Sequence, residues 1–230
     1  ELPPQHYIFP DVFFVWNAYW QERIPALSPL FSYYKTRLVI GGRGYTFTPG
    51  ACVERSLSYD TALRVMVPYE INVNSEDVCP YIERMLADEH IHVLLLLRGD
   101  IDREVQLTKY RTPTLRDHPR FTIVEPSEKE ELLRTTHVVA GVYSGFLDEA
   151  IERCIPVAVF ETSYPLFNDL VQDNLACAVN LKEDDLSVQF KKVALTPHSV
   201  LKERRSVFMK GAGSPGESLA YVLGRQSVSR

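Results

Sequence analysis

A strand end, a Ser-Gly turn and the start of a helix follow one another near residue 140, and such a stretch is suited to binding a phosphate. Small apolar residues end at Ala140, the turn holds Ser144 and Gly145, and a helix is expected from about Phe146. A helix N-terminus presents main-chain N–H groups and the positive end of its dipole to one point. The Ser144 hydroxyl can donate a hydrogen bond to a phosphate oxygen there.

Glu149 stands about one turn into the same helix. Its carboxylate can accept hydrogen bonds from two neighbouring hydroxyls, such as those of a ribose. A second interpretation is open, in which Ser144 is only the N-cap and Glu149 a solvated acid of the first turn, because both positions favour these residue types. Asp148 adds no acid–base pair, since adjacent helical residues point about 100° apart.

Short apolar runs alternate with amphipathic stretches after residue 60. The strand candidates are residues 62–67, 91–97, 121–124, 137–140, 156–160 and 176–181. Residues 75–87 place Val78, Ile82 and Met85 on one helical stripe, and Ser127 with Glu130 has the spacing of a capping box. Strands that alternate with helices predict an α/β fold with a doubly wound, mostly parallel, Rossmann-like sheet and right-handed crossovers.

In an open parallel sheet the ligand lies beyond the carboxyl ends of the strands, so the loops after each strand are the place to look. Arg98, Gly99 and Asp100 follow one strand candidate. Glu125, Pro126 and Ser127 follow the next. With the Ser144 turn, these loops form the predicted binding edge.

The first 60 residues lack this regularity. They hold strand candidates at 12–16 and 37–41, a helix from Asn17, and then residues 41–50, which contain four glycines and a proline. That density is typical of a linker, although a phosphate-binding loop is the alternative. We therefore predict that residues 1–60 are the remnant of an N-terminal domain plus a linker, and residues 61–230 the Rossmann-like domain.

Composition excludes several classes of protein. The 230 residues are 45% apolar and 24% charged with a net charge of −5, as in an ordinary globular protein. The basic residues are scattered, which argues against nucleic acid as a partner. The longest apolar run is far shorter than the roughly 20 residues of a membrane span. The chain starts at Glu1 without a signal-peptide pattern, and we expect a processed product or a piece of a longer chain.

Cys52, Cys79, Cys154 and Cys177 are widely spaced without a CxxC pair. We therefore expect four thiols rather than a zinc site or a disulfide framework, and a reducing, cytoplasmic location. The six histidines also form no ligand pattern, so no metal is expected.

The residues from Val138 to Val157 resemble the diagnostic stretch of the GT-B glycosyltransferases, in which a strand, a Ser-rich turn and an "EA…G-x-P" element hold the sugar nucleotide. Residues 14–20 and 37–42 are similar to the end of the N-terminal domain and the linker of capsule and teichoic-acid polymer transferases. Residues 211–218 are similar to the last helix of those enzymes and of UDP-N-acetylglucosamine 2-epimerases. Residues 154–157, 165–167 and Asp169 resemble exostosin-type transferases.

The resemblance implies a role for each candidate residue. Ser144 and Gly145 would meet the phosphate, and Glu149 the ribose. Glu125 and Pro126 would meet the base through main-chain groups. Arg98 would be the phosphate counter-charge, where capsule-type transferases usually carry a Lys-x-His-Pro element. Cys154 replaces the glycine of the "EA…G-x-P" element.

The resemblance therefore implies a GT-B C-terminal half that binds a nucleotide sugar, needs no cofactor or metal, and transfers the sugar to a glycan or polymer acceptor in polysaccharide biosynthesis. The alternatives are a non-catalytic nucleotide-binding or scaffold subunit and a UDP-sugar epimerase. The resemblance identifies no catalytic base in this chain. If one is present, Asp100, Glu125 and Asp148 are the first candidates. A missing domain would mediate any peripheral membrane association.

Overall fold

The computed structural model describes residues 12–27, 30–33, 35–41, 52, 57, 62–110, 112–115, 117–162, 168–182 and 185–211. Sequence motifs at residues 42–50, 165–167 and 212–218 lie outside these ranges. The chain divides into two compact units, one of Glu1–Pro49 with Ser206–Arg230 and one of Gly50–Arg205. The predicted boundary at residue 60 thus falls inside the second unit, and the C-terminal stretch goes with the first.

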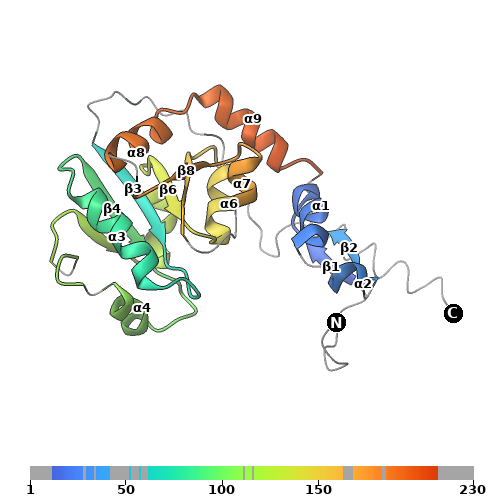
Figure 1. Ribbon diagram of the computed structural model, residues 1–230, viewed down its shortest axis with the longest axis horizontal. Helices are drawn as coiled ribbons and strands as arrows, with labels where there is room; N and C mark the ends of the chain where they lie inside the picture. The colour runs from blue at the N-terminus through green and yellow to red at the C-terminus, as the bar shows by residue number, and fades with distance from the viewer. Residues whose placement is uncertain are drawn as a thin grey trace. The chain divides into compact units, whose positions relative to one another are not determined.

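The larger unit is built on a six-stranded parallel sheet (Figure 1). Its strands are β3 (Leu63–Pro68), β4 (Ile91–Leu96), β5 (Phe121–Val124), β6 (Val138–Gly141), β7 (Val157–Phe160) and β8 (Cys177–Val179). They lie in the order β5-β4-β3-β6-β7-β8, and every neighbouring pair is parallel. All six predicted strands are present, so the predicted α/β, doubly wound sheet is confirmed.

Helices flank this sheet (Figure 1). The helices of this unit are α3 (Ser75–Leu86), α4 (Arg103–Lys109), α5 (Lys129–Leu133), α6 (Gly145–Glu152), α7 (Asn168–Gln172) and α8 (Leu186–Ala194), and α9 (His198–Phe208) begins in it and ends in the smaller unit. None of the helices in the described part of the chain is long and apolar enough to cross a membrane.

The core explains why the strands are continuous apolar runs. Val65 and Val67 of β3 pack in one cluster with Ile82 of α3 and Phe190 of α8. Met66, which alternates with them, is also completely buried. A parallel sheet covered on both faces buries successive side chains on opposite sides, so the period-two alternation of a half-exposed strand is lost.

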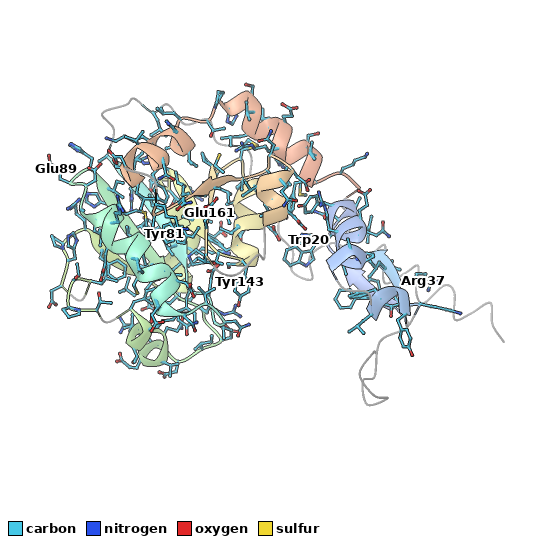
Figure 2. All side chains as sticks on the ribbon, viewed as in Figure 1. Trp20, Arg37, Tyr81, Glu89, Tyr143 and Glu161 are labelled. Atoms are coloured by element: carbon cyan, nitrogen blue, oxygen red, sulfur yellow. A yellow bond between two sulfur atoms is a disulfide. The ribbon has the colours of Figure 1, made fainter. Side chains whose placement is uncertain are left out.

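Tyr81 of α3 contacts the sheet at strands β7 and β8. Its ring stacks on Phe160 with centroids 4.4 Å apart. Its hydroxyl donates to the main-chain oxygens of Glu161 at 2.7 Å and Val179 at 3.2 Å (Figure 2). These bonds fix the carboxyl ends of β7 and β8 against α3.

The helical turn after β5 begins earlier than the predicted capping box. A 3₁₀ turn, η1 (Pro126–Glu128), precedes α5, and the main-chain N–H of Glu125 donates to Glu128 Oε2 at 2.9 Å. Glu125 rather than Ser127 is therefore the N-cap. Pro126 explains the difference, because proline is pre-organised for the first helical position and lacks the N–H that would be unpaired there.

The smaller unit contains β1 (Val12–Val15), α1 (Ala18–Leu27), α2 (Leu30–Tyr33) and β2 (Arg37–Ile40), with β1 and β2 paired in parallel. Buried Asn17 donates through Nδ2 to the main-chain oxygen of Phe208 at 2.8 Å. The Tyr19 and Phe208 rings pack with centroids 5.3 Å apart. These contacts attach the residues that follow Arg205 to the N-terminal segment.

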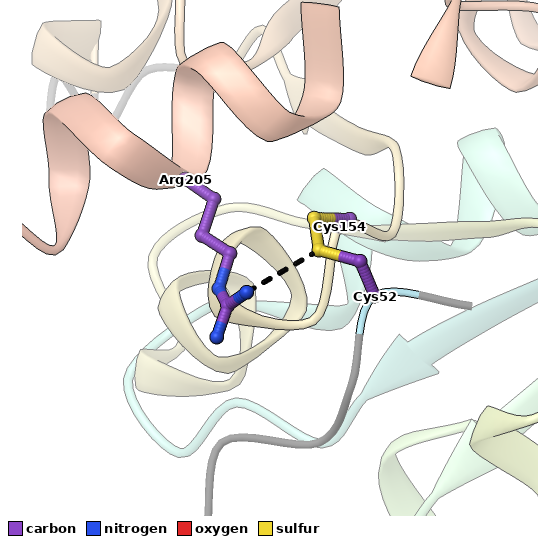
Figure 3. Close-up of a disulfide and its surroundings, with 3 residues drawn as sticks. All are labelled: Cys52, Cys154 and Arg205. Carbon is purple, nitrogen blue, oxygen red and sulfur yellow. Dashed lines mark hydrogen bonds between the residues drawn. A yellow bond between two sulfur atoms is a disulfide. The ribbon is translucent and has the colours of Figure 1, made fainter. Parts of the chain in front are cut away.

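The expectation of four thiols is wrong for one pair. Cys52 and Cys154 form a disulfide, with Cα atoms 5.3 Å apart across a sequence separation of 102 residues, and Arg205 Nη1 lies 3.5 Å from Cys52 Sγ (Figure 3). Cys79 and Cys177 are free thiols. Spacing gave no sign of the pair because only the tertiary fold brings the two cysteines together. The cytoplasmic location stays a prediction, without the support of four thiols.

Cys154 also occupies a backbone conformation that favours glycine. Its φ is +56°, and the N–H of Ile155 donates to the carbonyl of Ala150 at 2.9 Å, as in a left-handed helix C-cap. The transferases that this stretch of the sequence resembles carry glycine at the corresponding position. Here a cysteine accepts the left-handed conformation, and its side chain is the one that forms the disulfide.

We predict that the disulfide stabilises the larger unit. Closing a loop of about 100 residues contributes roughly 4–5 kcal/mol in the chain-entropy model, within a measured range of about 0–5 kcal/mol. Dithiothreitol should lower the urea midpoint of the wild type and leave that of Cys52→Ser unchanged. Cys177→Ser is the matched control and should respond to the reductant as the wild type does. A wild type that titrates four thiols in denaturant without reductant would contradict the pairing.

Candidate functional site

The carboxyl ends of β3 and β6 meet where the strand order reverses. From β3 the chain proceeds outward through β4 and β5, and from β6 it proceeds the other way through β7 and β8. The connections at such a switch point diverge and leave a crevice, where open α/β sheets bind ligands. The loops after β3 and β6 therefore form the centre of the candidate site.

The β6–α6 loop begins α6 as the sequence predicts. Ser144 is the N-cap, and its Oγ accepts a hydrogen bond from the N–H of Phe146 at 3.2 Å. Its main-chain oxygen accepts from the N–H of Leu147 at 2.8 Å. The N-cap interpretation of Ser144 is thus confirmed, and its contact with a phosphate stays a prediction, as does that of Gly145 at the first helical position.

Glu70 lies two residues after β3, and its carboxylate binds main-chain N–H groups of the β6–α6 loop. Sequence analysis did not identify this residue. Its Oε1 accepts from the N–H groups of Tyr143 at 2.8 Å and Ser144 at 2.7 Å. The N–H of Val142 lies 3.1 and 3.0 Å from its two oxygens. Glu70 is only 4% exposed. An acid in the loop after a strand at the switch point was the available signal.

The approach of Glu70 also accounts for Gly141. A Cβ at this position would lie 3.0 Å from Glu70 Oε1. Glycine at the end of β6 therefore leaves room for the carboxylate. A second bond joins the same two loops, because the N–H of Asn72 donates to the hydroxyl of Tyr143 at 3.1 Å (Figure 2).

Lys109 at the end of α4 is a cation beside this contact. Its Nζ donates to the main-chain oxygen of Glu70 and lies 5.0 Å from the ring centroid of Tyr69. Burial raises the pKa of Glu70, while the three loop N–H groups and Lys109 act in the opposite direction. Burial likewise lowers the pKa of Lys109, against the attraction of Glu70.

Glu149 is not a solvated acid, so that interpretation is wrong. It is 6% exposed, and its oxygens lie 3.2 Å from Lys129 Nζ and 2.9 Å from Arg153 Nη2. Arg153 also forms a two-pronged pair with Glu130 at 2.8 and 2.9 Å. Glu149 is therefore the buried member of a four-residue ion network. Its contact with a ribose stays a prediction.

The loops after β4 and β5 lie side by side. Pro126 Cγ would be 3.7 Å from a Cβ placed on Gly99. Glu125 Oε1 accepts from Arg103 Nε at 2.9 Å. Lys129, which follows η1 directly, then reaches across to Glu149. Through Lys129, the structure thus connects the loop of Glu125 and Pro126, predicted to meet the nucleotide base, with Glu149, predicted to meet the ribose.

Arg98 pairs with an acid of its own loop. Its guanidinium donates to both oxygens of Asp100, at 2.9 and 2.7 Å, and this hydrogen bonding lowers the pKa of Asp100. Buried Gln106 fixes the backbone here, accepting from the N–H of Arg98 and donating to its carbonyl, both at 2.8 Å. The role of Arg98 as phosphate counter-charge stays a prediction.

The carboxylates that sequence analysis placed first as catalytic candidates are all constrained. Asp100 is paired with Arg98, Glu125 with Arg103, and Asp148 is completely buried. Among the described residues no cluster of three or more His, Cys, Asp and Glu side chains is arranged to hold a metal ion.

Comparison with known proteins shows the fold. No family model and no curated protein sequence matches the chain. Among solved structures, it is similar to Arabidopsis thaliana UGT89C1 complexed with UDP, with 12% identity, a TM-score of 0.57, and coverage of 93% of this chain and 57% of that one. It is also similar to Anabaena HepE in complex with UDP and glucose, with 11% identity, a TM-score of 0.54, and coverage of 96% of this chain and 64% of that one. For the glycotransferase of kitacinnamycin the identity is 15% and the TM-score 0.53, with coverage of 84% of this chain and 50% of that one.

The chain spans about half to two thirds of the length of these structures. At such low identity the likeness concerns the fold alone. The sequence resemblance to the C-terminal half of GT-B glycosyltransferases is therefore confirmed as a resemblance in fold: this chain has a Rossmann-like fold similar to that of solved glycosyltransferase structures.

Proposed function

We propose that this chain is the nucleotide-sugar-binding part of a GT-B-type glycosyltransferase, which transfers a sugar to a glycan or polymer acceptor in polysaccharide biosynthesis. The observation that carries the proposal is the β6–α6 loop at the switch point, with Ser144 and Gly145 at the N-terminus of α6 and Glu149 on the same helix. Two of the structures with this fold contain UDP. The nucleotide sugar is a substrate, and the proposal needs no cofactor.

Each part of a nucleotide has a matching group along this edge. The positive end of α6 and the Ser144 hydroxyl suit a phosphate. Glu149, held by Lys129 and Arg153, offers carboxylate oxygens to a ribose. The main chain at Glu125 and Pro126 leads to Lys129, a partner of Glu149, and would meet the base of the nucleotide. The order phosphate, ribose and base thus runs from β6 toward β5.

The structure favours none of the three first candidates as the catalytic base. Asp100 and Glu125 are paired with arginines and Asp148 is buried, so none of the three presents an unpaired carboxylate to a substrate hydroxyl. The same observation is consistent with a second candidate function, that of a nucleotide-binding subunit without catalysis of its own. A UDP-sugar epimerase has no specific support in the structure.

We predict that UDP, CDP or CMP binds in the presence of a chelator. The positive end of α6 and the cations Lys109 and Lys129 supply the field that attracts a phosphate, without a metal ion. Calorimetric titration in EDTA measures this. Affinity that appears only with added magnesium or manganese would contradict the proposed site.

We predict that Glu149→Ala weakens nucleotide binding more than Ser144→Ala does. Loss of the carboxylate leaves two ribose hydroxyls without an acceptor, at a cost of about 1–3 kcal/mol if they are buried. Loss of the Ser144 hydroxyl removes an N-cap, worth about 1 kcal/mol of stability. The main-chain N–H groups at the N-terminus of α6 remain to bind the phosphate. Titration with UDP, alongside urea unfolding of each variant, measures both effects.

Glu130→Ala is the matched control for Glu149→Ala, because it removes the other carboxylate partner of Arg153 without touching the proposed ribose contact. We expect it to bind UDP as the wild type does. Equal binding by wild type and Glu149→Ala would assign Glu149 to the ion network alone.

We predict that this chain alone binds a donor but transfers its sugar slowly or not at all. Positioning of donor, acceptor and base can supply about 7–11 kcal/mol of barrier lowering, and the chain spans only part of the structures that share its fold. Release of free nucleotide is measured with and without an added N-terminal GT-B half. Rapid transfer by the chain alone would contradict this prediction. Asp100, Glu125 and Asp148 would then be the first residues to mutate in a search for the catalytic base.

A further inference from the structure

The contact between Glu70 and the β6–α6 loop has the chemistry of an anion-binding site that is already filled. Three consecutive N–H groups, those of Val142, Tyr143 and Ser144, converge on one carboxylate at 2.7 to 3.1 Å. Successive main-chain N–H groups that converge in this way form a concavity that binds anions. Here the anion is a side chain of the same protein.

The position of this contact is the one that a donor phosphate would need. The three N–H groups belong to the loop between β6 and α6, and Glu70 belongs to the loop after β3. Both loops lie at the switch point of the sheet, where Rossmann-like folds place the phosphates of nucleotides. A phosphate and the Glu70 carboxylate would therefore accept hydrogen bonds from the same donors.

Glu70 is held there against an electrostatic cost. It is 4% exposed, and burial disfavours its charge. The residues that follow it are exposed, Ile71 to 50%, and they form a turn before buried Val73. Glu70 itself lies between the end of β3 and this exposed turn, outside any strand or helix.

We propose that Glu70 is an internal competitor of the donor phosphate: its carboxylate occupies the N–H groups of residues 142–144 in the free chain, and an anionic phosphate of the nucleotide binds by displacing it. The inference rests on the proposed function for the identity of the ligand. Glu70 thereby sets donor affinity. Lys109, held by the main-chain oxygen of Glu70 and the face of Tyr69, remains at this edge as a counter-charge for the incoming phosphate.

The test compares Glu70→Ala and Glu70→Gln with the wild type. Calorimetry measures UDP binding, and thermal unfolding is followed with and without inorganic pyrophosphate. Removal of the competitor makes the binding-competent loop available, so we expect Glu70→Ala to bind UDP about tenfold tighter or more. Its Tm should rise with pyrophosphate more than that of the wild type. Glu70→Gln keeps the size of the side chain without its charge, and it should bind UDP more tightly than the wild type even if Glu70→Ala does not fold.

Glu161→Gln is the matched control. It removes one negative charge beyond the end of β7, where the Glu161 side chain accepts a hydrogen bond from Asn180 Nδ2. Its UDP affinity should equal that of the wild type, so a general change in charge at this edge would be detected.

The outcomes separate this inference from the proposed function. UDP binding that is equal or weaker in both Glu70 variants overturns the inference and leaves the proposed function intact, with Glu70 as a brace of the loop. Pyrophosphate that stabilises the Glu70 variants, with no nucleotide bound by any form, supports an anion site that Glu70 fills and overturns the proposed function. No response of any form to UDP or pyrophosphate overturns both.

Discussion

The carboxylate of Glu70 in the β6–α6 loop is the interaction on which the candidate site depends. It joins the loops that follow β3 and β6, the two central strands at which the sheet changes direction. In the free chain it accepts hydrogen bonds from three successive N–H groups of the turn that leads to Ser144, the N-cap of α6. Gly141 leaves room for the same contact, because a Cβ there would lie 3.0 Å from Glu70 Oε1.

Ion pairs organise the rest of this edge. Lys129 and Arg153 neutralise Glu149, Arg103 pairs with Glu125, and Arg98 pairs with Asp100. The exposed pairs contribute little to stability, since water screens them. The buried Glu149 network is different, because removal of one partner leaves another charge poorly solvated. A ligand that binds here must exchange partners with charged groups that the free chain already satisfies, which makes its affinity depend on those exchanges.

The fold of the larger unit was predictable because a parallel sheet covered on both faces buries nearly every residue of its four inner strands. Continuous runs such as Ile91–Leu96 therefore identify strands without alternation. Helix ends follow local rules in the same way, so Ser144 was predictable as an N-cap. Pro126 shows the limit of such rules: Ser127 and Glu130 fit a capping box, but the proline began the turn earlier.

Local patterns in the sequence were enough to predict the order of strands and helices, the edge at which their loops gather and the candidates Ser144, Gly145 and Glu149. The groups that those residues contact could not be predicted in this way. Glu70 and Ser144 are 74 residues apart, Cys52 and Cys154 are 102 apart, and Lys129 meets Glu149 from another loop. Spacing and periodicity report on neighbours within one element, whereas pairing across the sheet depends on the strand order, which brings distant loops to one edge.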